Sequence, residues 1–159
     1  MDLEAVVRRI ELDQLYTDYV HCLDADELER WPDFFTEDCF YRITSAENYQ
    51  AGLPLGLIYA TSRNMLKDRV SALREANIYE PQRYRHLVSS IRIVGDAAAT
   101  LDLVANFLVV RTMQDGEMTI FAAGHYADRV TQVGADWKFA AKTVILDSRQ
   151  IDTLLAIPI

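Results

Sequence analysis

The stretch from Leu12 to Ile43 constrains the fold most, because it places a long helix, an aromatic turn and a strand in direct succession. Its first part repeats apolar residues at the i, i+3, i+4 spacing of one helical face: Leu12, Leu15, Tyr16, Tyr19, Val20 and Leu23. Asp24-Ala25-Asp26 then interrupts this pattern with residues that suit a helix end or a cap.

The second part of this stretch is aromatic. A short helical turn carries Trp31, Phe34 and Phe35 on one side, residues 36–38 form a polar break, and residues 39–43 have the composition of a strand. This order predicts a plug around which a downstream sheet can wrap. We expect the three aromatic residues in the core, where burial of each contributes about 1.5–3 kcal/mol.

Two helices and one loop are predicted before residue 81. The first helix covers Leu3–Leu23, and Ser62 can cap a second helix that ends near Pro81, because the residue before proline avoids helical dihedral angles. Residues 45–61 contain glycines and a proline and predict a surface loop. Since this loop is rich in leucine, we expect its own chain or another chain to cover it.

Downstream of Pro81 the apolar pattern changes to a period of two, which is typical of strands. Four strands are predicted, joined by turns at residues 95–96, 115–116 and 134–136: Tyr84–Val94, Ala97–Met113, Met118–Val133 and Trp137–Leu146. Gly124 is a candidate bulge or bend. Consecutive strands joined by tight turns predict an antiparallel meander, and helices followed by a curved sheet make an α+β fold. Because no linker or repeat is apparent, we predict a single domain over residues 1–159.

Composition and charge exclude several classes of partner. The formal net charge is −8, so a basic face for phosphate is not expected and nucleic acid is not a predicted partner. No apolar run approaches the roughly 20 residues of a membrane helix, and residues 1–4 lack the apolar core of a signal peptide. Cys22 and Cys39 lie far apart without metal-ligand spacing, which is typical of reduced, buried thiols. We therefore expect a cytoplasmic protein without a membrane partner.

No motif for a metal, a nucleotide or a covalent nucleophile is present in the sequence. The histidines His21, His86 and His125 are scattered, and no Cys-x-His with a partner Cys-x-x-His indicates a Rieske cluster. The sequence also lacks a glycine-rich phosphate loop and a nucleophile elbow. We expect a chain without a cofactor or a metal of its own.

The densest group of chemically active side chains is Arg83-Tyr84-Arg85-His86. In a strand its arginines point to one face and its tyrosine and histidine to the other, and the position after Pro81 predicts the rim of the sheet. Asp24, Glu75 or Glu80 could supply carboxylates to the arginines. Two interpretations stay open: the arginines bind carboxylates of a partner subunit, or they are solvated or paired within the chain.

A catalytic interpretation is also open. A cone of sheet around helices can hold a cavity, in which His86, an acid such as Asp24 and a tyrosine such as Tyr41 could perform acid–base chemistry. Nothing in the sequence brings these residues within reach of one another.

The predicted strand Ala97–Met113 has one apolar face and one mixed face. The apolar face suits the helix-covered side of the sheet: Leu101, Leu103, Ala105, Phe107 and Val109. The mixed face carries Val104, Leu108 and Val110, which we expect to be buried against another subunit, with ordinary solvent exposure as the alternative. The apolar residues near the end of the sequence, Leu154 and Leu155 among them, are expected to be docked.

The chain resembles the small (β) subunits of aromatic-ring-hydroxylating Rieske oxygenases over its whole length. The resemblance is carried by WPDFFTEDC at 31–39, DRVSALREANIYE at 68–80, RYRH at 83–86 and DTLLAIP at 152–158. Within the family the chain is most similar to the subunits of terephthalate, salicylate and anthranilate hydroxylating systems. The first of these segments is also typical of the wider cone-shaped fold shared with nuclear transport factor 2 and ketosteroid isomerase.

This resemblance implies a strongly curved antiparallel sheet wrapped around the N-terminal helices, a nuclear transport factor 2-like or cystatin-like cone. It implies a structural β subunit of a multicomponent oxygenase that hydroxylates an aromatic acid. Such a subunit supports a large catalytic α subunit in an α3β3 hexamer, which includes a trimer of β subunits. The Rieske 2Fe-2S cluster and the mononuclear iron are expected on the α subunit, and the family offers no catalytic residue to carry over to this chain.

Contacts with partners are the remaining expectation. The predicted interface residues are Arg83, Tyr84, Arg85, His86, Val104, Leu108, Val110, Leu154 and Leu155. We expect the first four at the contact with the α subunit and the others where β subunits meet. A stand-alone, cofactor-free isomerase or dehydratase on the same fold is the alternative function.

Overall fold

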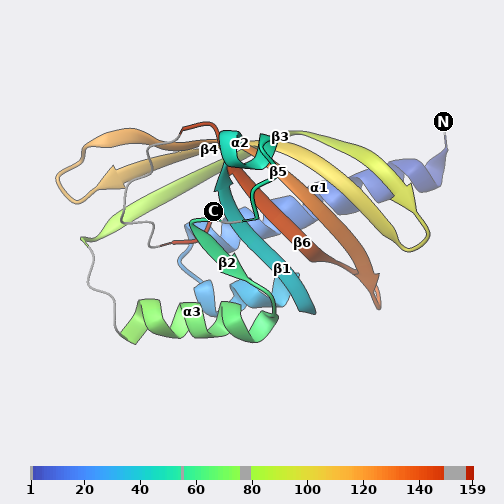
Figure 1. The fold of residues 1–159 in the computed structure, drawn as a ribbon, viewed down its shortest axis with the longest axis horizontal. Coiled ribbons are helices and arrows are strands. Elements are labelled where there is room, and N and C mark those ends of the chain that lie inside the picture. The colour runs from blue at the N-terminus through green and yellow to red at the C-terminus, as the bar shows by residue number, and fades with distance from the viewer. Residues whose placement is uncertain (1, 55, 76–79, 149–156) are drawn as a thin grey trace.

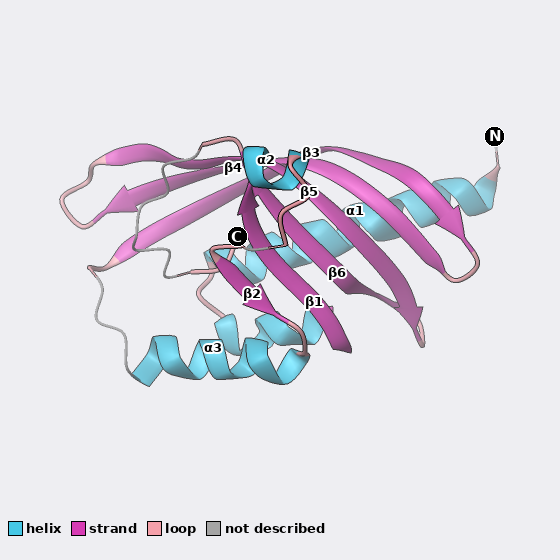
Figure 2. Cartoon of the chain, viewed as in Figure 1, coloured by secondary structure: helices cyan, strands magenta, loops and turns pink. Residues whose placement is uncertain are grey.

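Helices packed against one curved sheet make up this protein (Figures 1 and 2). The computed structural model describes residues 2–54, 56–75, 80–148 and 157–159. In chain order the elements are α1 (Leu3–Asp24), the 3-10 helix η1 (Leu28–Phe34), β1 (Phe35–Ser45), α2 (Ala46–Gln50), β2 (Ile58–Ala60), α3 (Arg63–Glu75), β3 (Gln82–Ala97), β4 (Thr100–Met113), β5 (Met118–Val133) and β6 (Asp136–Leu146). The predicted α+β fold is confirmed.

The sheet has six strands in the order β2-β1-β6-β5-β4-β3. Strands β3 to β6 each pair antiparallel with their neighbour in the chain, which confirms the predicted meander. Strand β1 joins β6 in parallel, a pairing that alternation along the chain did not predict because the two strands are far apart in sequence. Strand β3 is an edge strand, so its first residues lie at the rim of the sheet.

The first helix and the aromatic turn form where the sequence predicts them. The Asp2 carboxylate accepts a hydrogen bond from the backbone N–H of Glu4 at 3.0 Å and caps α1. The buried face of α1 packs against the sheet, behind which the helix runs diagonally in Figure 1: Leu12, Leu15, Tyr16, Tyr19, Cys22 and Leu23. Trp31 and Phe35 are fully buried and Phe34 is partly buried, so the expected aromatic core is confirmed.

Two segments between residues 36 and 61 differ from the sequence-based expectation. The polar residues 36–38 are part of β1, whose pairing with β6 shifts register between Phe35 and Phe40, so that Glu37 and Asp38 stay exposed without ending the strand. The expected loop at 45–61 contains α2, which the Ser45 hydroxyl caps, and the short strand β2. Elements of this length carry too few residues to show a periodic pattern.

The turns between long strands are set by bulges as well as by glycines. The β3–β4 turn lies at residues 98–99 and not at the expected 95–96, because register shifts between β3 and β4 add residues to β3. Gly116 has a φ of 91° in the β4–β5 turn, as a turn glycine should. Gly124 is no bulge: it pairs regularly, and a Cβ there would lie 1.9 Å from the backbone oxygen of Ile145.

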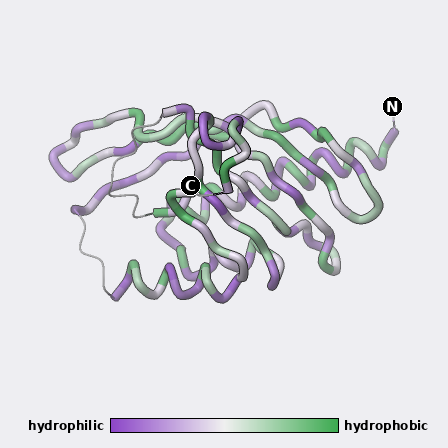
Figure 3. Tube along the Cα trace, in the orientation of Figure 1, coloured by the Kyte–Doolittle hydropathy of each residue, from purple (hydrophilic) through white to green (hydrophobic). Residues whose placement is uncertain are grey.

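The faces of β4 are divided as predicted. Its inward residues are buried: Leu101, Leu103, Ala105, Phe107 and Val109. The residues between them keep part of their surface exposed, and this outward side is called the outer face below. Figure 3 shows the corresponding alternation of hydrophobic and hydrophilic residues along the strands and along α3. The core therefore lies between the inner face of the sheet and the helices.

Candidate functional site

The segment Arg83–His86 lies near the beginning of the edge strand β3, at the rim of the sheet. Tyr84 and His86 point into the core and are 3% and 5% exposed, whereas Arg83 and Arg85 are exposed on the outer face. The structure thus confirms the prediction that the arginines lie on one face of the strand and the tyrosine and histidine on the other. Among the residues that the structure describes, neither arginine forms an ion pair with a carboxylate.

Asp24 binds His86 instead of the arginines. One carboxylate oxygen lies 2.6 Å from His86 Nδ1, and the other accepts the backbone N–H of His86 at 3.0 Å. This carboxylate ties the end of α1 to the edge strand and is almost as buried as the imidazole. The suggestion that Asp24 neutralises an arginine is therefore wrong, because the helix end meets the inward side of β3.

The structure assembles only part of the catalytic group considered from the sequence. It brings Asp24 and His86 together, but the Tyr41 hydroxyl donates elsewhere, to the backbone oxygen of Ile159 at 3.0 Å. The imidazole exposes no surface. A hollow of about 590 Å³ lies beside the dyad, lined by Asp24 and by residues 81–85, without the His86 ring. A substrate in this hollow would meet the carboxylate and the arginines, not the imidazole.

A buried charged network lies deeper in the core and was not predicted. Lys142 Nζ lies 2.9 Å from Asp128 Oδ2, and the Tyr16 hydroxyl donates to the same oxygen at 2.6 Å. Burial raises the pKa of Asp128 and lowers that of Lys142, and their mutual attraction opposes both shifts. The alternation of the strands could have predicted this pair. Asp128 on β5 and Lys142 on β6 both lie at inward positions whose neighbours are mostly apolar.

The outer face of the sheet is apolar at the end near Arg85. There, exposed Leu87 lies opposite Leu108, and exposed Ile120 lies opposite Val110. We call Leu87, Leu108, Val110 and Ile120 the outer patch. Val104, the other predicted residue of this face, is partly buried and lies closer to the polar end, where Arg129 pairs with Asp102 at 2.8 Å. Leu154 and Leu155 lie outside the described residues.

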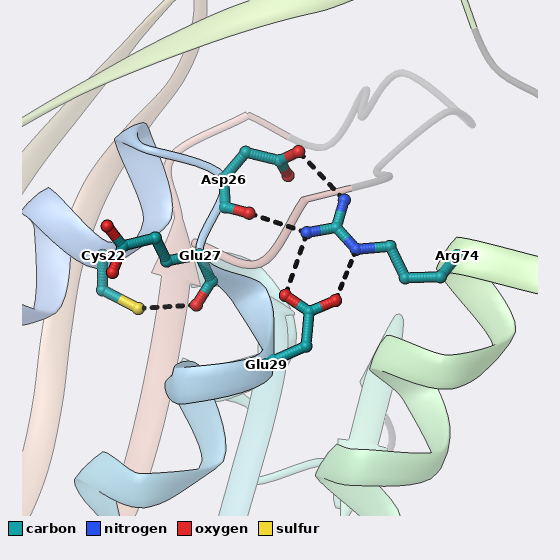
Figure 4. Close-up of polar contacts among 5 residues, drawn as sticks. All are labelled: Cys22, Asp26, Glu27, Glu29 and Arg74. Carbon is teal, nitrogen blue, oxygen red and sulfur yellow. Dashed lines mark hydrogen bonds and ion pairs between the residues drawn. The ribbon is translucent and has the colours of Figure 1, made fainter.

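An arginine clamp joins α3 to the segment that follows α1 (Figure 4). Arg74 donates to both carboxylate oxygens of Glu29, at 2.8 and 3.2 Å, and to the Asp26 carboxylate at 2.9 Å. The guanidinium holds the pKa of Glu29 below its ordinary value. In the same view the Cys22 thiol donates to the backbone oxygen of Glu27 at 3.1 Å. These contacts join α3 to the segment that directly follows Asp24, the last residue of α1.

Among the residues that the structure describes, no group of three His, Cys, Asp or Glu side chains is placed to hold a metal ion. None of the helices in the described part of the chain has the length and apolarity that crossing a bilayer requires.

The cone of curved sheet around helices places this protein in the nuclear transport factor 2-like class. The sequence model of the family described as "Ring hydroxylating beta subunit" matches residues 19–153. The chain belongs to this family, as its resemblance predicted.

Relatives of known identity agree with this assignment. The small subunit of anthranilate 1,2-dioxygenase from Burkholderia cepacia is 44% identical over 149 residues, which are 94% of this chain and 92% of that protein. The β1 subunit of the terminal oxygenase component of terephthalate 1,2-dioxygenase from a Comamonas species is 39% identical over 97% of this chain and 100% of its own. A crystal structure of a β subunit assigned to an aromatic-ring-hydroxylating dioxygenase of Novosphingobium aromaticivorans matches with a TM-score of 0.90 and 39% identity, over 98% of this chain and 99% of that one.

Proposed function

We propose that this chain is the non-catalytic β subunit of a cytoplasmic Rieske oxygenase that hydroxylates an aromatic acid. The relatives named above support the substrate class, since anthranilate and terephthalate are both aromatic acids. In this proposal the large α subunit carries the Rieske 2Fe-2S cluster and the mononuclear iron. The β subunit supports it in an α3β3 hexamer.

The observation that carries this proposal is the pair of arginines at the rim. Arg83 and Arg85 stand exposed on an edge strand, without a carboxylate partner among the described residues, in a chain whose net charge is −8. The strand that carries them is anchored on its inward side, where Tyr84 and His86 are buried and His86 binds the Asp24 carboxylate. Guanidinium groups suit carboxylates of a partner, so the arginines are the proposed contact with the α subunit.

The outer patch supports self-association. It joins the arginine strip directly, because Arg85 and Val110 are register partners across β3 and β4. Stable interfaces combine an apolar centre with a charged rim, and this end of the sheet offers both. We assign the outer patch to contacts between β subunits and the arginines to the adjoining contact with the α subunit.

Arg85→Ala tests the contact with the α subunit. Truncating one member of a desolvated charge pair costs about 2–5 kcal/mol, whereas an exposed pair is worth about 1 kcal/mol or less. Binding of the α subunit, measured by co-purification and sedimentation, is therefore expected to weaken more than tenfold. Circular dichroism of the isolated variant should be unchanged. Arg92→Ala, which removes an exposed arginine farther along β3, is the matched control.

Two outcomes would count against the contact. If Arg85→Ala unfolds the isolated chain, the arginine serves the fold. If assembly and turnover both stay unchanged, the arginine is a solvent-exposed residue that takes no part in the contact. The alternative of a stand-alone isomerase or dehydratase is less well supported, because the His86 imidazole is enclosed and Tyr41 is engaged with Ile159.

A further inference from the structure

A groove runs beside the N-terminal half of α1, at the end of the molecule where the β3–β4 and β5–β6 turns lie (Figure 1). Two hollows of about 470 and 560 Å³ form it, and Glu11 and Trp137 line both. We call these two hollows together the α1 groove. One wall is α1, and the other consists of η1 and the strand ends at the two turns. The groove lies at the opposite end of β3 from Arg83 and Arg85, so the docking surfaces assigned above do not account for it.

The face of α1 that borders this groove is apolar and exposed. Leu3, Val7 and Ile10 are 75%, 44% and 61% exposed, and their i, i+4, i+7 spacing places them on one side of the helix. All three side chains line the α1 groove. Because the exposed side of a surface helix is ordinarily polar, an apolar row beside a groove indicates a surface that a partner covers.

Trp137 stands where the two hollows meet. Its Nε1 donates to Glu11 Oε2 at 2.9 Å, which orients the indole against α1. The residue is partly buried and packs against the core, while it also lines both hollows. An aromatic side chain that is already oriented loses little conformational freedom on binding, so Trp137 suits the centre of an interface.

The charges of the α1 groove favour a basic occupant. The cations that line it are engaged within the chain: Arg8 with Asp96, Arg30 with Glu27, and Lys138 with a backbone oxygen. Three carboxylates that line it form no ion pair with the residues that the structure describes: Glu4, Asp33 and Asp136. Lysine or arginine side chains of a partner would therefore find carboxylates on both sides of an apolar floor.

We propose that the α1 groove binds a basic amphipathic helix of another protein. The groove follows α1 from residue 3 to residue 15, about 18 Å of helix axis, which a partner helix of about three turns covers. An extended segment would need an open strand edge, whereas these walls are helix and turns. A second copy of this chain, with its net charge of −8, would bring more carboxylates than cations. This inference goes beyond the proposed function and does not depend on it.

The test uses the full-length chain and two synthetic peptides. One has leucine and lysine in helical periodicity over about 14 residues, and the other has glutamate in place of lysine. Trp137 reports binding by fluorescence, because Trp31, the other of the two tryptophans, is fully buried in the core. The lysine peptide should change the emission to saturation, and the glutamate peptide should not.

Ile10→Asp separates recognition by the groove from general attraction of a basic peptide to an acidic chain. The added carboxylate strengthens general attraction, but it removes an apolar contact, so the lysine peptide should bind at least about tenfold more weakly. Ser71→Asp adds the same charge on the exposed side of α3 and should not weaken binding. If Ile10→Asp does not fold, Leu3→Asp takes its place, because Leu3 is more exposed.

Several results would overturn the proposal. Unchanged or tighter binding of the lysine peptide to Ile10→Asp would show that charge alone attracts it, and equal binding of both peptides would remove the carboxylates from recognition. Loss of self-association in Ile10→Asp, measured by sedimentation, would show that a second copy covers the groove. Co-sedimentation of the unchanged chain, but not of Ile10→Asp, with phosphatidylcholine vesicles would assign the apolar row to a lipid surface.

Discussion

Lys142 Nζ lies 2.9 Å from Asp128 Oδ2, and neither side chain exposes any surface. The two residues are register partners on β5 and β6, so the hairpin itself brings them together. The ammonium also lies 3.5 Å from the centre of the Tyr126 ring. Because desolvation of both charges offsets much of their attraction, we expect this pair to fix strand register more than to add stability.

Removing one member of the pair should be far more damaging than removing both. Lys142→Met leaves a carboxylate buried without its counter-charge and should lower the free energy of unfolding by about 3–5 kcal/mol in urea denaturation. Adding Asp128→Leu should restore most of that loss. Lys67→Met, on the exposed side of α3, is the control and should change stability by less than about 0.5 kcal/mol. Equal stability of Lys142→Met and the unchanged chain would contradict this account.

The buried thiols give the protein a pH dependence on the alkaline side. Burial raises the pKa of Cys22 and of Cys39 from 9.0 to about 11. Between these values the unfolded chain loses thiol protons that the folded chain retains. The stability contribution is thus complete below pH 9.0 and is lost as the pH rises toward about 11.

Denaturation midpoints measured across this window should fall with rising pH. The double variant Cys22→Ala, Cys39→Ala should show a shallower fall. Some decline should remain at the upper end, because burial also raises the pKa of Tyr16, Tyr19, Tyr41 and Tyr126. The same slope with and without the cysteines would show that the thiols do not contribute.

Long elements of this fold could be predicted from the sequence, and short or non-local ones could not. α1 and β5 have enough residues to display their periods, and their bounds match the expectation closely. β2 has three residues, too few to alternate visibly. The parallel pairing of β1 with β6 depends on how the core closes, which no local pattern records.

The candidate site divides in the same way. Strand alternation correctly placed Arg83 and Arg85 outward and Tyr84 and His86 inward, because that property is local. The pairing of His86 with Asp24 required α1 to end beside the edge strand, which is a tertiary event. The contact of the arginines with a partner subunit stays a prediction.

Gly124 is expected to tolerate no side chain. A Cβ at this position would lie 1.9 Å from the Ile145 backbone oxygen, and backbone in the middle of a sheet cannot move aside. Gly124→Ala should therefore cost about 3 kcal/mol or more, or abolish soluble expression. Gly95→Ala is the matched strand control, since its Cβ would meet the flexible Asp102 side chain at 3.0 Å. Similar melting temperatures for the two variants would refute the steric argument.

The outer patch predicts how β subunits associate. Leu87 is 51% exposed and Ile120 is 70% exposed, values that leave much apolar surface in water unless a second subunit covers it. Leu87→Asp places a carboxylate in that contact. In the isolated subunit the same carboxylate stays in solvent. Sedimentation should therefore shift from the proposed trimer to a monomer without a change in circular dichroism. Asn106→Asp adds the same charge at an exposed, polar position of the outer face and should remain a trimer.

A trimer that persists in Leu87→Asp would place the interface elsewhere, and a monomer in the unchanged chain, both alone and with the α subunit, would reject self-association.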